Sequence, residues 1–219
     1  MSQSVSVARA TLVPIPSSPR DSGDPSTSKR IRIVDAALRC IESSGLRGTT
    51  VDDVARSAGM SRATLYRAMP GGRDEIIQSV VDTELARFFS TLAVSMGTAE
   101  SLEEVLVSGM VTAARSIRGS GALSTVLEEE PWVILRHLSF GEMDHAIGVA
   151  ADFAEPFFGR WLEPDQAIRA ADLAVRLVVS YLLDPDEAVD LTDEASVRQL
   201  ARRHVLPGIE ALRSPLDLS

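Results

Sequence analysis

The chain of 219 residues lacks most features that mark secreted and membrane-bound proteins. Its single cysteine, Cys40, excludes a disulfide within one chain. No stretch approaches the roughly 20 consecutive apolar residues of a membrane-spanning helix. The first 28 residues lack the apolar centre of a signal peptide and are rich in Ser, Pro and Asp. We therefore expect a cytoplasmic protein with no membrane partner.

Motifs of catalysis and metal binding are also missing. The chain contains no nucleophile elbow, no phosphate-binding glycine loop and no convincing pair of catalytic carboxylates. Acidic and histidine residues do occur between 128 and 145, without tight ligand spacing: Glu128, Glu129, Glu130, His137, Glu142, Asp144 and His145. We expect no metal and no cofactor, and an all-α enzyme remains an alternative without a motif to support it.

Charge is unevenly distributed along the chain. The net charge is −9, but residues 29–75 hold nine Lys or Arg against six Asp or Glu, whereas residues 76–219 hold eleven against twenty-three. All basic residues except Lys29 are arginines, whose planar guanidinium suits bidentate contacts to phosphate or guanine. Segregated charge of this kind favours a nucleic-acid surface in the first segment and another role for the second.

Hydrophobic periodicity predicts an all-α protein, because no strand-like alternation occurs. Residues 1–28 show no apolar period and are expected to form a disordered arm. Helices are predicted over 28–44, 51–58, 62–69, 73–96, 101–118, 122–129, 131–139, 143–162, 164–184 and 194–213, with a kink at Pro207. These helices predict two domains after the arm, residues 29–80 and residues 81–219.

Two of the predicted helices are unusually short. The stretch "VDDVARSAGMSRATLYRAMPGG" starts after a capping Thr50, passes a turn at Gly59, restarts after a capping Ser61 and stops at Pro70. Two short helices joined by a glycine turn are typical of a helix-turn-helix, whose second helix enters the DNA major groove. Leu65 and Met69 are spaced to pack inward, which leaves the polar side chains for DNA.

The segment "GTTVDDVARSAGMSRATLYRAMPGGRDEI" resembles the DNA-binding domain of the TetR family of bacterial transcriptional regulators. The matching positions are Thr49, Thr50, Val51, Val54, Ala55, Ala58, Gly59, Met60, Ser61, Leu65 and Tyr66. Three departures stand out: Met69 replaces a common Phe, Ala68 replaces a frequent His or Tyr, and an extra glycine puts Arg73 where the family has Lys.

The resemblance implies a set of DNA-contacting residues. Phosphate contacts are expected from Thr50, Ser61, Tyr66 and Arg73, and contacts to bases or flanking phosphates from Arg62, Ala63, Thr64 and Arg67. Tyr66 could equally be a core aromatic, and the arginines could be solvated surface charge. Lys29, Arg30 and Arg32 either reach the DNA or simply solubilise the arm.

The second domain is expected to bind a small molecule and to dimerise, as in the family that the chain resembles. Core packing or an apolar effector pocket would both account for Trp132, Phe140, Phe153, Phe157 and Trp161. Helices 164–184 and 194–213 are expected to form the homodimer face through Leu173, Leu177, Tyr181, Leu200, Val205 and Ile209. The leading hypothesis is a repressor that binds a palindromic double-stranded operator and is released by an apolar or amphipathic effector. A helical protein that sequesters lipids or binds other proteins is the second alternative, which leaves the basic segment unexplained.

Overall fold

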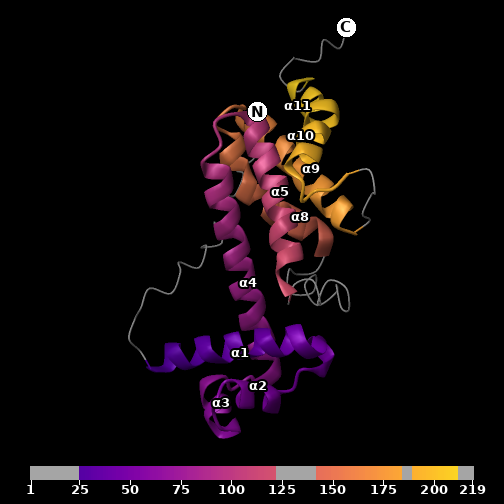
Figure 1. Cartoon of the computed structure of the whole chain (residues 1–219). Coiled ribbons are helices and arrows are strands. Elements are labelled where there is room, and N and C mark those ends of the chain that lie inside the picture. The colour runs from indigo at the N-terminus through magenta and orange to yellow at the C-terminus, as the bar shows by residue number, and fades with distance from the viewer. Residues whose placement is uncertain (1–24, 122–141, 184–188, 212–219) are drawn as a thin grey trace, which may run out of the picture.

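The computed structural model describes residues 25–121, 142–183 and 189–211, and every regular element in these ranges is a helix (Figure 1). The first four helices are α1 (Pro25–Gly48), α2 (Val51–Ser57), α3 (Arg62–Ala68) and α4 (Gly72–Gly97). They are followed by α5 (Leu102–Gly119), α8 (Glu142–Phe158), α9 (Pro164–Leu183), α10 (Glu194–Leu200), η1 (Ala201–Val205) and α11 (Leu206–Ala211). The fold is therefore all-α, as predicted.

Two separate apolar cores share the long helix α4. The first core joins α1, α2, α3 and the start of α4 and includes Ile33, Leu65, Met69 and Val80. The second core includes Met96 near the end of α4, together with residues of α5, α8, α9, α10, η1 and α11. Figure 1 shows α4 as an upright rod, with α1 lying crosswise at its lower end and the later helices beside its upper end.

Polar contacts fasten α10 and η1 to α5 in the second core. Glu103 of α5 accepts hydrogen bonds from Arg198 at 2.7 Å and from Arg202 at 2.9 Å. Arg202 first, and then Arg198, lower the pKa of the Glu103 carboxyl, because both stabilise its charged form. These contacts join residues almost a hundred positions apart, which the sequence pattern alone does not reveal.

Most predicted helix ends are confirmed by the structure. Gly45 leaves helical geometry with φ of 71°, so the continuous part of α1 ends at Ser44 as expected. The first helix starts earlier than predicted, because α1 already begins at Pro25 and not at Ser28. Helix 143–162 was predicted too long: α8 ends at Phe158 and Gly159 opens a turn. The predicted helices 122–129 and 131–139 lie outside the described residues.

The predicted kink at Pro207 takes the form of a π-turn one turn earlier. Pro207 has no N–H to donate, and its ring would collide with the carbonyl four residues before it. The helix widens over η1, where the Leu206 amide donates to the carbonyl of Ala201, five residues back. The widened turn carries Arg202, Arg203 and His204 on the surface. None of the described helices is long and apolar enough to cross a membrane.

Candidate DNA-binding interface

Helices α2 and α3 form a helix-turn-helix whose two starts are capped by hydroxyls. The Thr50 hydroxyl accepts from the Asp53 amide, and the Ser61 hydroxyl accepts from the Thr64 amide, each at 3.2 Å. Hydrogen bonds from the Thr50 hydroxyl, and further ones from Arg56 and the Thr50 amide, lower the pKa of the Asp53 carboxyl. Gly59 has φ of 65°, a left-handed conformation that a glycine adopts without strain and that turns the chain between the helices.

One side of α3 is anchored and the other is exposed. Leu65 and Met69 are fully buried, which confirms the predicted inward-facing pair. Thr64 is half-buried at the start of the helix, and the remaining predicted contact residues of α3 lie exposed: Arg62, Ala63, Tyr66 and Arg67. The cap residues Thr50 and Ser61 are exposed as well. We refer to these residues together as the reading face.

Arg62 is held by contacts from two helices. Its Nη1 atom lies 3.1 Å from Oδ2 of Asp52 on α2, and its guanidinium lies 5.6 Å from the centre of the Tyr66 ring. The side-chain hydrogen bond to Tyr66 and the negative charge of Asp52 raise the pKa of Arg62. Asp52 was not singled out from the sequence, because acidic side chains are expected to avoid a DNA surface. Arg67 turns back along its own helix and donates to the carbonyl of Ala63 at 3.2 Å.

The extra glycine before α4 makes room for Tyr66. Gly72 has φ of 61°, and a Cβ atom built on it would lie 3.0 Å from Cε1 of Tyr66. Tyr66 is 38% exposed, so its ring rests on the Gly72 backbone while part of the residue faces solvent. The ring is therefore neither a core aromatic nor a free surface group.

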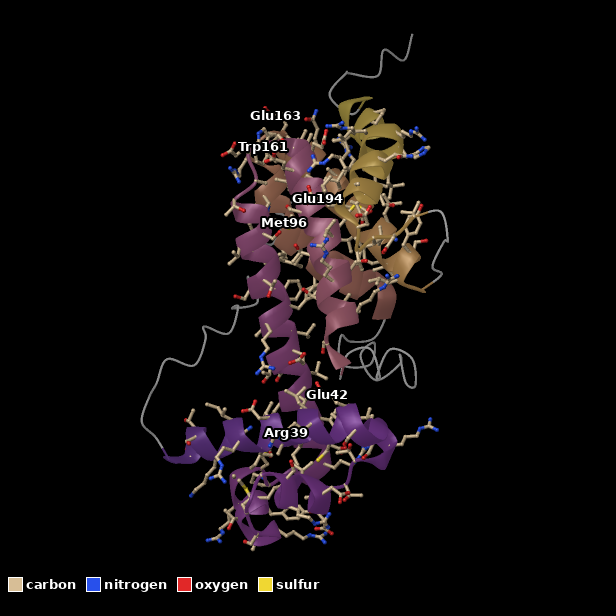
Figure 2. The ribbon with its side chains drawn as sticks, in the orientation of Figure 1. Arg39, Glu42, Met96, Trp161, Glu163 and Glu194 are labelled. Atoms are coloured by element: carbon tan, nitrogen blue, oxygen red, sulfur yellow. The ribbon has the colours of Figure 1, made fainter. Side chains whose placement is uncertain are left out.

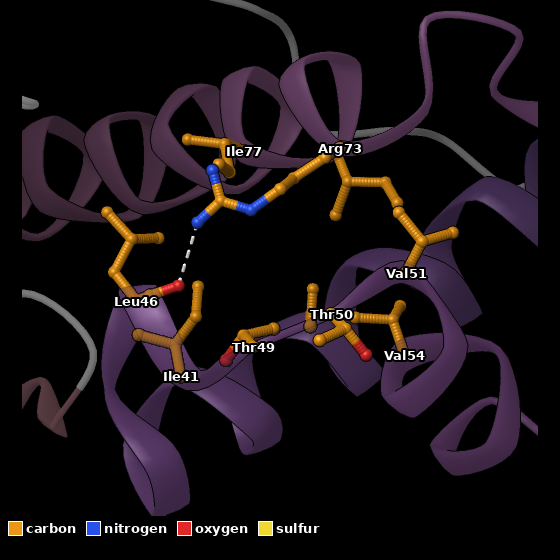
Figure 3. Close-up of a pocket in the computed structure, with 10 residues that line it drawn as sticks. Ile41, Leu46, Thr49, Thr50, Val51, Val54, Arg73 and Ile77 are labelled. Atoms are coloured by element: carbon orange, nitrogen blue, oxygen red, sulfur yellow. Dashed lines mark hydrogen bonds between the residues drawn. The ribbon is translucent and has the colours of Figure 1, made fainter.

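Arg73, predicted as a phosphate clamp, bridges α4 to the end of α1. Its Nη2 atom donates to the carbonyl of Leu46 at 2.9 Å (Figure 3). Below the guanidinium lies a small apolar cavity of about 10 Å³, lined by residues that include Ile41, Val54 and Ile77. A cavity of that size is close to the minimum for one water molecule, so it is not an effector site.

Arg30 and Arg32 have a role that the sequence did not indicate. Arg32 donates to the carbonyl of Ala58 at the end of α2, at 2.6 Å. Arg30 donates to the carbonyl of Ala68 at the end of α3, at 2.8 Å, and to Glu75 of α4, at 2.7 Å. Both guanidiniums thus occupy the negative ends of short helices, where the helix dipole favours a cation. Both residues thus hold α1 against the ends of α2 and α3, and Lys29 beside them is exposed.

Removing Arg30 should loosen α3. We expect Arg30→Ala to lower the free energy of unfolding by about 1–2 kcal/mol, because two charge-assisted hydrogen bonds are lost from a side chain that is partly exposed. Urea unfolding followed by circular dichroism measures the change. Arg39→Ala is the matched control on α1: Arg39 is exposed and only approaches Ser57 at 3.5 Å, so we expect less than about 0.5 kcal/mol.

The same contact predicts a pH dependence. Arg30, and then the Gly71 amide, lower the pKa of Glu75 below its usual 4.5. A lowered pKa in the folded state contributes stability that is present above the unfolded pKa and is lost as pH falls through the folded pKa. The stability difference between the native chain and Arg30→Ala should therefore shrink below about pH 4.5. An equal difference at pH 7 and pH 3 would contradict a role for this ion pair.

The predicted effector residues are only partly described. Phe153 and Phe157 of α8 form a row of rings with Phe89 of α4, with centroids 4.7 Å and 5.5 Å apart. Trp161 lies beneath the guanidinium of Arg160 at 4.4 Å. All three predicted residues in this region pack against the second core. Trp132 and Phe140 lie outside the described residues.

The predicted dimer face needs a correction. Leu200, Val205 and Ile209 are 8%, 1% and 0% exposed within a single subunit, so they form its core and leave nothing for a partner. Their apolar spacing suggested an interface, because a helix shows the same period whether its buried face packs within one subunit or against a partner. Leu177 and Tyr181 are half-buried against the same core. Leu173 is 37% exposed and Ile168, which was not predicted, is 52% exposed on α9.

The geometry described here is that of a helix-turn-helix DNA-binding protein with a helical second domain. Residues 33–78 match the family model "Bacterial regulatory proteins, tetR family". An uncharacterised HTH-type transcriptional regulator of Mycobacterium tuberculosis is 29% identical over 180 residues, covering 80% of this chain and 83% of that protein. Residues 33–78 therefore form a helix-turn-helix domain of the kind that this family model describes.

Solved structures share the fold. The TetR family repressor AlkX from Dietzia sp., implicated in biodegradation of n-alkanes, aligns with a TM-score of 0.56 at 23% identity, covering 83% of this chain and 95% of that one. The regulator FadR from Bacillus subtilis, in complex with stearoyl-CoA, aligns with a TM-score of 0.52 at 17% identity, covering 78% and 96%. At these identities the alignments establish the common fold.

Proposed function

We propose that this regulator is a repressor that binds a palindromic operator as a homodimer and leaves it when a small apolar or amphipathic effector binds. The observation that carries the proposal is the reading face on α3. It is polar and exposed, and it is anchored through Leu65 and Met69 to a core that also contains the start of α4. A single helix of seven residues reads few base pairs, so two copies on a two-fold axis are needed for specificity.

The two cores support a functional division near Val80, inside α4. The first core contains Ile76 and Val80. The second contains Met96, which Figure 2 labels on α4. Residues 29–80 would then hold the DNA and residues 81–219 the effector and the partner subunit. Because both domains share one rigid helix, a tilt of its upper part would move the reading face.

Polar contacts at the junction could transmit such a tilt. The buried carboxylate of Glu84 accepts from Arg87 at 2.7 Å and from Ser120, after the end of α5, at 2.9 Å. Arg87 also lies 3.7 Å from Asp35 of α1. A shift at the end of α5 would thus be passed through Glu84 and Arg87 to α1. An effector acts only if it binds the two arrangements with different affinity.

The aromatic row of Phe89, Phe153 and Phe157 supports an apolar effector, since such a row would suit an acyl chain. FadR of Bacillus subtilis carries stearoyl-CoA in the same fold. We therefore propose fatty acyl-CoA thioesters or related long-chain compounds as the first class to examine.

Operator binding can be tested without knowing the regulated genes. Purified protein is used to enrich duplexes from a random pool, and we expect an inverted repeat to emerge. Band shifts on that repeat are then measured with octanoyl-, palmitoyl- and stearoyl-CoA, and we expect at least one to release the DNA. Free coenzyme A is the control for the nucleotide part. Enrichment of no sequence, even at low salt, would refute operator binding, whereas enrichment without release by any thioester would refute only the effector class.

A further inference from the structure

We propose that Asp52 determines the specificity of DNA reading, by holding Arg62 so that its guanidinium addresses a base edge instead of any nearby phosphate. This inference rests on the proposed operator binding and assigns different roles to the two arginines of α3. Asp52 would act as a positioning residue through Arg62.

Arg62 is constrained from two directions. One nitrogen of its guanidinium is engaged by Asp52 at 3.1 Å, and the guanidinium lies over the Tyr66 ring at 5.6 Å. The ring in turn rests on the backbone of Gly72. The contacts therefore run from α2 through α3 to the start of α4, and they leave the outer N–H groups of Arg62 pointing in a restricted set of directions. A bidentate contact to guanine O6 and N7 requires such an orientation.

The ion pair is not explained by stability. The side chains of Arg62 and Asp52 are 62% and 55% exposed, and ion pairs this exposed contribute little to folding. Close to DNA the situation changes, because water leaves the interface and the pair strengthens. The carboxylate also repels phosphates and offsets the charge of Arg62, which lowers sequence-independent affinity. Asp52 would thus favour a cognate base pair over the uniform backbone.

Arg67 provides the contrast on the same helix. It donates to the Ala63 carbonyl at 3.2 Å and approaches the Thr64 hydroxyl at 3.5 Å. Both of these partners are neutral, so the full positive charge of Arg67 remains for phosphate. Arg62 is paired with a carboxylate, whereas Arg67 is paired with neutral oxygens. This difference assigns base reading to Arg62 and phosphate binding to Arg67.

The test compares affinities for two duplexes, the best sequence enriched by the native protein and a scrambled duplex of the same composition. For Asp52→Asn we expect tighter binding to the scrambled duplex and weaker binding to the enriched one, so that their affinity ratio falls by about 10-fold. The slope of the logarithm of scrambled-duplex affinity against the logarithm of salt concentration should become steeper by about one released counterion. Asp52→Glu, which keeps the carboxylate, should retain most of the ratio.

Further variants separate positioning from charge and from folding. Asp74→Asn removes one exposed carboxylate from the first turn of α4, and we expect it to leave the ratio within about 3-fold of native. Arg62→Lys keeps the positive charge but loses the planar fork of the guanidinium, so the affinity ratio should fall as in Asp52→Asn. This second variant keeps the proposal testable if Asp52→Asn folds poorly. In the Arg62→Ala background, Asp52→Asn should lower the ratio no further.

Three results would overturn the proposal: an unchanged ratio in Asp52→Asn or Arg62→Lys, an equal fall in Asp74→Asn, or a further fall in the double variant. Absence of any enriched sequence with the native protein would instead refute operator binding itself, and with it the role of Asp52.

Discussion

Replacing Ile168 and Leu173 by glutamate together should convert the regulator to a monomer and weaken operator binding by about 100-fold or more. Ile168 and Leu173 are 52% and 37% exposed on α9, which makes them the large apolar side chains of that helix that a partner can cover. A two-fold interface places each residue against the same patch of the partner, so every introduced charge is present twice. The pair of glutamates would then face like charges in a desolvated contact.

Size-exclusion chromatography with light scattering measures the mass, and band shifts on the enriched duplex measure the affinity. Val94→Glu is the matched control, since Val94 is 68% exposed on a different helix, α4, and we expect this variant to stay dimeric. Leu200→Glu has a different expected outcome: Leu200 is 8% exposed within one subunit, so the charge should unfold the second core. A double variant that remains dimeric would place the interface elsewhere.

Gly72→Ala should lower both the stability of the DNA-binding domain and its affinity for the operator. The new residue would adopt φ of 61°, and its Cβ would lie 3.0 Å from the Tyr66 ring. We expect a loss of about 1–3 kcal/mol in the free energy of unfolding from the left-handed backbone. We also expect a loss of about 10-fold in operator affinity, because a displaced Tyr66 no longer supports Arg62.

Gly72→Asn separates the two causes, since Asn tolerates the left-handed conformation but still carries a Cβ. It should recover part of the stability and little of the affinity. Gly97→Ala is the control at the other end of α4, where no atom lies within 4 Å of the added Cβ, and it should be close to neutral. A Gly72→Ala variant that binds and unfolds like the native chain would show that Tyr66 does not depend on this glycine.

The fold and the reading face were largely predictable because their signals are local. The caps at Thr50 and Ser61, the glycine at position 59 and the stop at Pro70 each act within one or two turns. The inward spacing of Leu65 and Met69 follows from helical period alone. The predicted contact residues of α3 are accordingly exposed, except Thr64, which is half-buried.

Contacts between distant segments were not predictable in the same way. Arg30 and Arg32 precede the helix ends that they cap by 38 and 26 positions, and nothing in their neighbours marks them as caps. The apolar stripe of Leu200, Val205 and Ile209 indicated burial but not whether the same subunit or its partner provides the cover. Periodicity identifies which face of a helix is buried, but it does not identify the helix or subunit that covers this face.

The sequence by itself determined that this protein is helical, that its first segment forms a helix-turn-helix, and that α3 ends before Pro70. Propensity, capping and hydrophobic period act along the chain and need no knowledge of the rest of the fold. Only the tertiary structure decided that Gly72 supports Tyr66, that Asp52 engages Arg62, and that α10 and η1 belong to the core of one subunit. These features depend on which surfaces meet in space, and side chains far apart in the chain meet only after the helices have packed.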